Sequence, residues 1–382
     1  MIPRLLAAVL CVLGPFTGAA LGGSINGEAT YVSFSVPGSV GTYPMSMNAS
    51  MTVTGYYYVA NVTPTLVRGF VRDADGTITT FDVGGPFGLG DGTVWTIPES
   101  INAAGDITGF YQYPPVGPPG DEWGEIAPVD GFLRYADGRT TGAVPTVGTL
   151  TQSQPVSIND FDEVAGNAPY LTPFSVFTRS GRGVYKAGIS FDKLTLATAI
   201  NDSGSVVGFS GRSGIPASGF VLHPDGFAAS VVVPAQSGPS CAANGTFPDG
   251  INAAGTIAGW YVSSTDNCVT TNTGGFVMSP DGVFSLFQPP GMLLASPVGV
   301  FGGSLLAPHS ISIDEAGDVT GSYRDAGGVE HGFVRNPYGT LTTFDPPEGK
   351  QTTATSIAGG GLVAGYYEYN SGGPAVGFIR IP

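Results

Sequence analysis

The stretch Ile251–Gly259, with the sequence INAAGTIAG, decides the fold because its pattern recurs along the chain. An apolar residue is followed by Asn, by a Gly three residues after the Asn, and by a second Gly four residues further on. Seven copies, 42 to 62 residues apart and in part degenerate, begin at Met47, Ile101, Ile158, Ile200, Ile251, Ile313 and Ile357. Periods of this size are typical of repeat folds such as propellers and solenoids.

A second pattern follows each copy: Gly-Phe, an apolar residue, and a Gly six residues after the Phe. It is clear at Phe70, Phe132, Phe220, Phe276 and Phe333, degenerate at Phe177, and runs into the C-terminus at Phe378. The Gly is often preceded by Asp, as in Asp75-Gly76, and a Thr-Thr-Phe-Asp type of strand follows in the best copies. The third copy departs most, because Asp162 stands where Gly is usual and the Gly-Phe pair is missing.

These two patterns predict two tight turns in every repeat. An Asn side chain can bond its own backbone two residues on, and a following Gly accepts a positive φ. Asp-Gly closes a second hairpin in the same way. Because β-branched and aromatic runs flank both turns, each repeat is predicted to be a four-stranded antiparallel sheet.

Seven such sheets bury their faces if they pack around a central axis, so we expect an all-β, seven-bladed β-propeller with four-stranded antiparallel blades. The last repeat ends after its third strand, and the segment 32–38 matches the fourth strand of the fifth repeat, residues 285–291, in register. We therefore expect this N-terminal strand to close the last blade and protect its edge. A β-solenoid or two sandwich domains remain the alternatives.

The repeat resembles the HAF-type extracellular repeats of bacterial exported proteins. The nearest match runs from His331-Gly332-Phe333-Val334-Arg335 to Thr342-Thr343-Phe344-Asp345, and the resemblance extends over residues 31–382. It implies a secreted repeat architecture, and it brings no established reaction or catalytic residues.

Composition excludes several classes of protein. Of 382 residues, 60 are Gly and 31 are Pro, which rules out a mainly helical fold. The many aromatic and β-branched residues argue against disorder. A formal net charge of −15 argues against a nucleic-acid partner, since phosphate binding needs clustered Lys and Arg.

Residues 1–22 are predicted to be a secretory signal peptide, with an apolar run from Leu5 to Leu13 and cleavage near Ala20. The run is too short for a transmembrane anchor, although an N-terminal anchor helix is the alternative. We expect residues 23–382 to form a single secreted or periplasmic domain and a monomer. Cys241 and Cys268 are then expected to pair as a disulfide, with free buried thiols as the alternative.

One end of the predicted propeller carries the uniform Asn and Asp-Gly turns, and the other carries loops of variable length. Binding residues gather on such loops, so we expect a ligand there. The second repeat places aromatic and acidic residues on this side, and the candidate ligand-binding residues are Trp95, Glu99, Tyr113, Asp121, Glu122, Trp123 and Glu125. Trp faces beside carboxylates suit a sugar, although these residues can also merely cover their own loop. Trp260 is expected in the core.

No cofactor motif or nucleophile elbow is present, and the three His residues lack metal-ligand spacing, so no metal or cofactor is expected. The leading hypothesis is a non-catalytic propeller that binds an extracellular glycan or envelope component. The alternative is a polysaccharide hydrolase or lyase that uses loop carboxylates, which would have to converge across a pocket. A purely structural surface-repeat protein is a third hypothesis.

Overall fold

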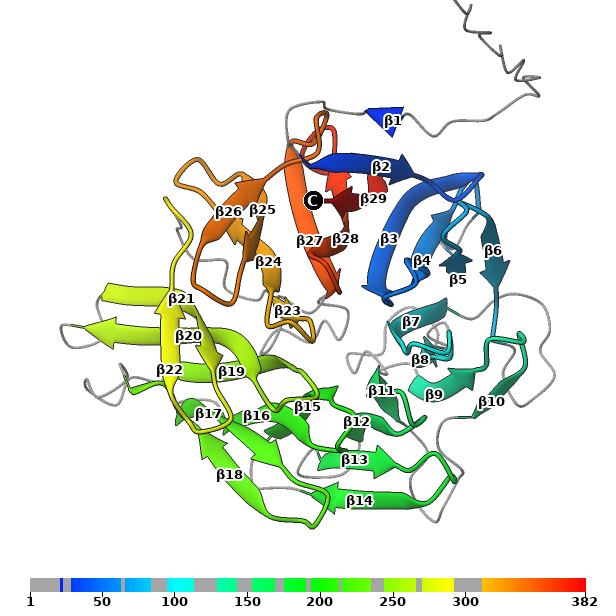
Figure 1. The fold of residues 1–382 in the computed structure, drawn as a ribbon. Coiled ribbons are helices and arrows are strands. Elements are labelled where there is room, and N and C mark those ends of the chain that lie inside the picture. Colours follow the sequence, from blue (N-terminus) through cyan, green and yellow to red (C-terminus); the bar gives the residue numbers. More distant parts are fainter. Residues whose placement is uncertain are drawn as a thin grey trace, which may run out of the picture.

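The computed structural model describes residues 21–22, 29–62, 66–83, 95–112, 129–142, 153–168, 175–189, 194–212, 215–234, 244–265, 270–291 and 311–382. These residues form antiparallel sheets and contain no α-helix, which confirms the all-β class. Figure 1 shows the sheets arranged around a common centre, with the first strand of each sheet innermost, as in a propeller.

The repeats fold in chain order, each into its own run of neighbouring strands. The first three sheets are β3 (Ser39–Met47), β4 (Val53–Val59), β5 (Val67–Arg72) and β6 (Ile78–Phe81); β7 (Trp95–Ile101), β8 (Ile107–Gln112), β9 (Val129–Arg134) and β10 (Thr140–Gly142); and β11 (Gln154–Ile158), β12 (Val164–Ala168), β13 (Ser175–Arg179) and β14 (Tyr185–Ile189).

The next strands continue in the same order. They are β15 (Leu194–Ile200), β16 (Val206–Arg212), β17 (Ile215–Leu222) and β18 (Ala228–Val231); β19 (Gly245–Ile251), β20 (Ile257–Thr265), β21 (Thr270–Met278) and β22 (Phe284–Phe287); and β23 (Ile311–Ile313), β24 (Val319–Arg324), β25 (Glu330–Arg335) and β26 (Leu341–Phe344). One parallel pair, Ala217 with Gly245, joins β17 to β19.

The last sheet combines the two ends of the chain. It contains β27 (Gln351–Ala358), β28 (Leu362–Glu368) and β29 (Ala375–Ile381), followed by β2 (Thr30–Phe34) and the short β1 (Leu21–Gly22). Strand β2 pairs antiparallel with β29, and Phe34 lies opposite Gly377. In the fifth repeat Phe287 lies opposite Gly275, so the register is the one that the sequence match predicts.

The Asn turns form for the expected reason. In the fifth repeat the Asn252 Oδ1 accepts the Thr256 N–H at 2.9 Å, and Gly255 closes the turn with a φ of +84°. The degenerate third repeat makes the same turn with Asp162 at a φ of +58°, and its sheet has the usual four strands. A non-glycine residue in this region is strained, and Asp tolerates it better than most.

The Phe residues of the second pattern form the core between the sheets. Phe70, Phe132, Phe276 and Phe378 are fully buried. The Gly before several of them is needed because an aromatic ring of the fourth strand covers it: a Cβ at Gly69 would lie 2.7 Å from Phe81. Phe34 covers Gly377 at the same 2.7 Å, so β2 takes the fourth-strand position.

This strand order defines two sides of the molecule, which we call the turn side and the loop side. The turn side carries the Asn turns and the Asp-Gly turns, all within the described residues. On the loop side the second strand of each sheet ends and the third strand begins.

Candidate functional site

The innermost strands surround a central cavity of about 130 Å³. Every innermost strand contributes to it, and most of the lining residues stand one or two positions before the apolar residue that opens each Asn turn, joined by Ile200, Ile251 and Ile313 themselves. A β-bulge occurs there in most of these strands, for instance between Pro98 and Ser100. Because a bulge breaks the in–out alternation, it directs an additional side chain toward the cavity.

Hydroxyl groups form one layer of the cavity wall. Ser46, Ser100, Ser157, Ser312 and Ser356 each accept the backbone N–H of the apolar residue in the next sheet, at 3.1 to 3.3 Å. These bonds link neighbouring sheets at the centre. Since the hydroxyl oxygen accepts in them, each Ser keeps its own O–H to donate.

Two carboxylates occupy the bulge positions of β7 and β19. Glu99 is 7 % exposed and Asp249 is 9 % exposed, and both line the cavity. Figure 1 shows β7 and β19 on opposite sides of the centre. Among the described residues no hydrogen-bond partner of the Glu99 carboxylate is found, and burial raises its pKa to about 8.

Asn side chains of five repeats line the turn side of the cavity. Each Asn Nδ2 donates to the backbone carbonyl of the equivalent residue in the next sheet, at 2.9 to 3.2 Å, in the series Asn48, Asn102, Asn159, Asn201, Asn252 and Asp314. The series ends at Asp314, which has no Nδ2. Its Oδ2 is buried without a partner, and burial raises the pKa of this carboxyl.

A wider opening of about 280 Å³ lies outside this Asn series. Asp160, Asp202 and Glu315 line it, and each accepts a backbone N–H from the preceding sheet. The residues that line the cavity and this opening include no Lys, Arg or His. The passage into the centre from the turn side is therefore acidic.

On the loop side, partly buried tyrosines lie at the junction of the first and last sheets. Tyr43 stacks on Tyr56 with ring centroids 4.9 Å apart, and Tyr58 and Tyr366 meet its ring edge-on at 5.4 and 5.0 Å. Trp95 packs against the same group. Burial, with smaller contributions from Tyr58 and Glu368, raises the pKa of Tyr43 to about 12.

Carboxylates border these tyrosines. Thr353 Oγ1 donates to Glu330 Oε1 at 2.8 Å, and the Glu330 N–H donates to Gln351 Oε1 at 2.9 Å. The pKa of Tyr366 is raised, chiefly by burial, with Glu330 and Glu368 among the charges that contribute. The loop side thus presents aromatic faces beside acidic and amide groups.

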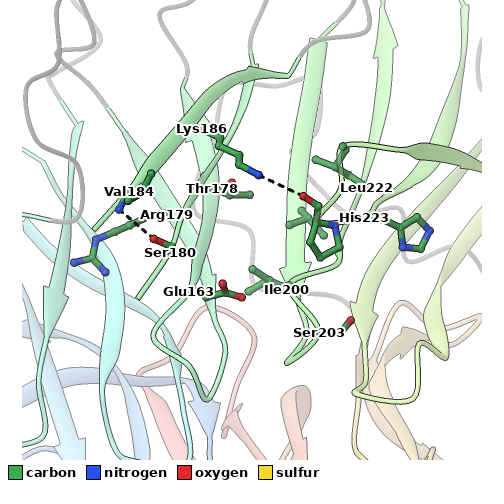
Figure 2. A pocket seen from close by; sticks show the side chains of 14 residues that line it. Glu163, Thr178, Arg179, Ser180, Val184, Lys186, Ile200, Ser203, Leu222 and His223 are labelled. Atoms are coloured by element: carbon green, nitrogen blue, oxygen red, sulfur yellow. Dashed lines mark hydrogen bonds between the residues drawn. The ribbon is translucent and has the colours of Figure 1, made fainter. Parts of the chain in front are cut away.

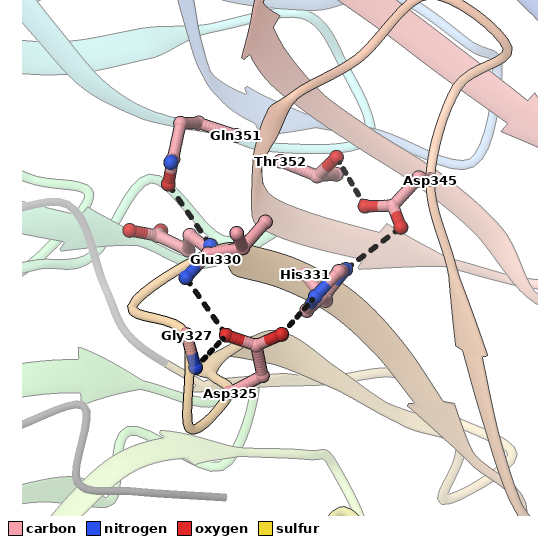
Figure 3. A network of polar contacts seen from close by, with 8 residues as sticks. Asp325, Gly327, Glu330, His331, Asp345, Gln351 and Thr352 are labelled. Carbon is pink, nitrogen blue, oxygen red and sulfur yellow. Dashed lines mark hydrogen bonds and ion pairs between the residues drawn. The ribbon is translucent and has the colours of Figure 1, made fainter. Parts of the chain in front are cut away.

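His331 lies between two carboxylates in the sixth repeat (Figure 3). Its Nδ1 is 2.7 Å from Asp345 Oδ2 and its Nε2 is 3.5 Å from Asp325 Oδ2. Thr352 Oγ1 donates to the other oxygen of Asp345 at 2.6 Å. Partial burial lowers the pKa of His331, but the hydrogen bonds and charges of Asp345 and Asp325 outweigh it, so the pKa is raised.

A cavity of about 160 Å³ lies between the third and fourth sheets, and Figure 2 shows the side chains that line it. Lys186 Nζ donates across it to the Pro224 carbonyl at 3.3 Å, and the Glu163 carboxylate accepts from Asn159 Nδ2 at 2.9 Å. Lys186 and Glu163 therefore already have hydrogen-bond partners within the protein. We regard this cavity as a packing gap between two sheets and not as the candidate site.

The structure places three of the Trp and acidic residues that the sequence analysis singled out. Trp95 and Glu99 were expected to bind a ligand on the loop side, but both belong to β7, and the bulge after Pro98 directs Glu99 into the central cavity. Trp260 stacks on Phe247 at 3.9 Å in the core, as expected. The remaining predicted residues lie outside the described residues: Tyr113, Asp121, Glu122, Trp123, Glu125, Cys241 and Cys268.

Sequence reasoning missed Asp249, the tyrosine junction and the His331 contacts. The sequence does contain a signal for Asp249, because this residue stands in the same position relative to its Asn turn as Glu99 does. The described residues contain no group of three or more His, Cys, Asp or Glu placed to hold a metal ion. They also contain no helix long and apolar enough to cross a membrane.

Comparison with known proteins defines the fold but not a family. No family model and no curated protein matches the sequence. Virginiamycin B lyase from Staphylococcus aureus is similar in structure, with a TM-score of 0.53 and 11% identity over 93% of this chain and 99% of that one. An acylaminoacyl peptidase from Pyrococcus horikoshii has a TM-score of 0.55 and 7% identity over 90% of this chain and 52% of that one. At such identities the likeness shows a propeller-like fold alone.

Proposed function

We propose that the chain is a closed, seven-bladed propeller that is exported and binds a glycan on its loop side without catalysing a reaction. The seven Asn-turn repeats and the pairing of β2 with β29 support the closed ring. The Phe34 side chain supports the closed propeller further, because it covers Gly377 as the Phe81 side chain covers Gly69.

The tyrosine junction is the observation that carries the binding function. Tyr43, Tyr58 and Tyr366 are partly exposed, and Glu330, Glu368 and Gln351 border them. An aromatic face covers the apolar face of a sugar ring, while carboxylate and amide oxygens accept its hydroxyls. A rigid scaffold that holds these groups at the loop side suits recognition of an extracellular polysaccharide.

A glycan array tests this function. The intact protein is expected to bind a subset of glycans, and Tyr366→Ala is expected to lose at least tenfold in affinity, whereas Tyr366→Phe keeps most of it. Tyr338→Ala is the matched control, since Tyr338 is 94 % exposed in a turn on the other side. Equal loss in Tyr338→Ala, or no glycan bound by the intact protein, contradicts the proposal.

His331 favours a second candidate, a polysaccharide-acting enzyme. His is the side chain that most often transfers protons in catalysis, and a carboxylate at Nδ1, as Asp345 is here, orients the ring so that Nε2 can act on a substrate once its 3.5 Å contact with Asp325 opens. A polysaccharide cleavage screen separates the two functions: product release that disappears in His331→Ala identifies an enzyme and ends the non-catalytic proposal.

Export and the disulfide belong to the same proposal. The mature protein is expected to begin near Leu21, as the apolar run before it predicts. N-terminal sequencing of the exported protein checks the cleavage, and non-reducing peptide mapping checks the bond between Cys241 and Cys268.

A further inference from the structure

We propose that the central cavity binds one hydrated divalent cation of the hard, oxygen-preferring class, between Glu99 and Asp249. This site is separate from the loop side and does not depend on the proposed glycan binding.

Glu99 is the first reason. Its side chain is more than nine-tenths buried, it lines the cavity, and no hydrogen-bond partner of its carboxylate is found in the described part of the chain. A buried carboxylate without a partner is costly to keep ionised, and a cation in the cavity removes that cost. Asp249 supplies a second carboxylate from the far side, so two negative charges match one divalent ion.

The other lining groups decide the class of ion. The Ser layer adds hydroxyl oxygens, and no His or Cys lines the cavity. Oxygen ligands without imidazole or thiolate suit Mg²⁺ and Ca²⁺ and are poor for zinc or copper. Because two carboxylates are too few to enclose an ion, the ion keeps several of its waters, for which a cavity of about 130 Å³ has room.

The approach from the turn side favours the same ligand. Asp160, Asp202 and Glu315 line the opening there, and no basic residue lines the opening or the cavity. A passage with one sign of charge raises the local concentration of counter-ions. A cation entering by this route passes the Asn series and reaches the carboxylates.

Calorimetric titration of the chelator-treated protein tests the site, with MgCl₂ in one arm and CaCl₂ in the other. One ion per chain is expected to bind in at least one arm, and the same ion is expected to raise the melting temperature by several degrees. Crystals grown with Mn²⁺ are expected to show an anomalous peak in the cavity.

Glu99→Gln and Asp249→Asn are each expected to fold, because the changes are isosteric and remove a buried charge, and to weaken ion binding at least tenfold. Asp73→Asn and Glu348→Gln are matched controls at exposed positions and keep wild-type binding. Absence of binding in both arms overturns the proposal. So does binding that Glu99→Gln and Asp249→Asn leave unchanged, or an anomalous peak elsewhere only.

Discussion

In five of the seven repeats one Asn performs two tasks at the centre of the molecule, whereas the sixth repeat has Asp314 and the seventh has Ala358 at this position. The Asn Oδ1 closes its own turn, and the Asn Nδ2 bonds to the carbonyl of the equivalent residue in the next sheet. Both ends of the amide are therefore required, which explains why Asn rather than Ser or Asp recurs in the pattern. Asp314 performs the first task through its Oδ1 and leaves its Oδ2 buried without a partner.

Asp314→Asn is expected to stabilise the protein by about 1 kcal/mol at pH 8, because the new Nδ2 can donate as the other Asn residues do. Burial raises the folded pKa of Asp314 above the unfolded one, so the folded state binds more protons between the two values. The free energy of unfolding of the wild type therefore falls as pH rises from the unfolded to the folded pKa of Asp314. The variant has no carboxyl at this position and does not show this decrease. Urea unfolding from pH 4 to 8 measures both effects.

The control is Asn252→Asp, which makes the reverse change at a position where the Asn forms both of its hydrogen bonds. This variant is expected to destabilise the protein by about 1–3 kcal/mol. Equal stability of wild type and Asp314→Asn at every pH contradicts this account of the Asn series.

His331 is expected to stabilise the sixth repeat mainly in its protonated form. The folded pKa is raised above the usual 6.5 by the hydrogen bonds and charges of Asp345 and Asp325, which outweigh partial burial. The stabilisation is therefore complete below about pH 6.5 and disappears as pH rises through the folded pKa. His331→Gln is expected to lower the melting temperature at pH 5.5 and to change it little at pH 9. A larger loss at pH 9 than at pH 5.5 contradicts the ion-pair assignment.

At the scale of the element, the bulge found in six of the seven innermost strands explains the last Gly of those repeats. The bulge moves a backbone carbonyl toward the second strand, where a side chain has no room. A Cβ at Gly109 would lie 2.2 Å from the Ile97 oxygen, and a Cβ at Gly259 would lie 2.2 Å from the Phe247 oxygen. The same bulge directs Glu99 into the cavity, so one local irregularity accounts for a sequence signature and for a candidate site.

Gly109→Ala and Gly259→Ala are each expected to destabilise the protein by about 3 kcal/mol, since backbone must shift to admit the methyl group. Gly359→Ala is the control, because a Cβ there meets nothing within 4 Å, and its effect is expected to stay within about 0.5 kcal/mol. Chemical denaturation measures all three. If Gly109→Ala is as stable as Gly359→Ala, the close approach is not what selects Gly.

For the whole molecule, the pairing of β2 with β29 is the contact that joins the two ends of the described chain. Deletion of residues 30–36 is expected to cost at least the roughly 3–5 kcal/mol of one buried Phe, because Phe34 leaves with the strand. Deletion of residues 1–22 is the control and is expected to leave the melting temperature within a few degrees of wild type.

A synthetic peptide of residues 29–38 is expected to restore much of the lost melting temperature by adding itself as a strand beside β29. If deletion of residues 30–36 leaves the melting temperature unchanged, β2 does not contribute to the stability of the last sheet.

Much of this architecture follows from local sequence signals. Asn252 and Gly255 specify a turn, the Gly-Phe pairs mark core positions, and the match of Phe34 with Phe287 gives the register of β2. The cavity could not be derived in this way. Which side chain a bulge turns inward, and which carbonyl in the next sheet an Asn reaches, depend on contacts between repeats. Hence Glu99 was expected on a loop, and the role of Asp249 was missed.

The sheet built from both ends also has a consequence for synthesis. On the ribosome β2 emerges long before its partner β29. Until β29 emerges, β2 has an unpaired edge that can pair with a non-native strand. Nascent chains are therefore expected to require a chaperone that binds them until β29 is synthesised. A nascent chain that stalls before β29 keeps this edge available, and a second molecule can donate its own last strand to it, giving swapped dimers.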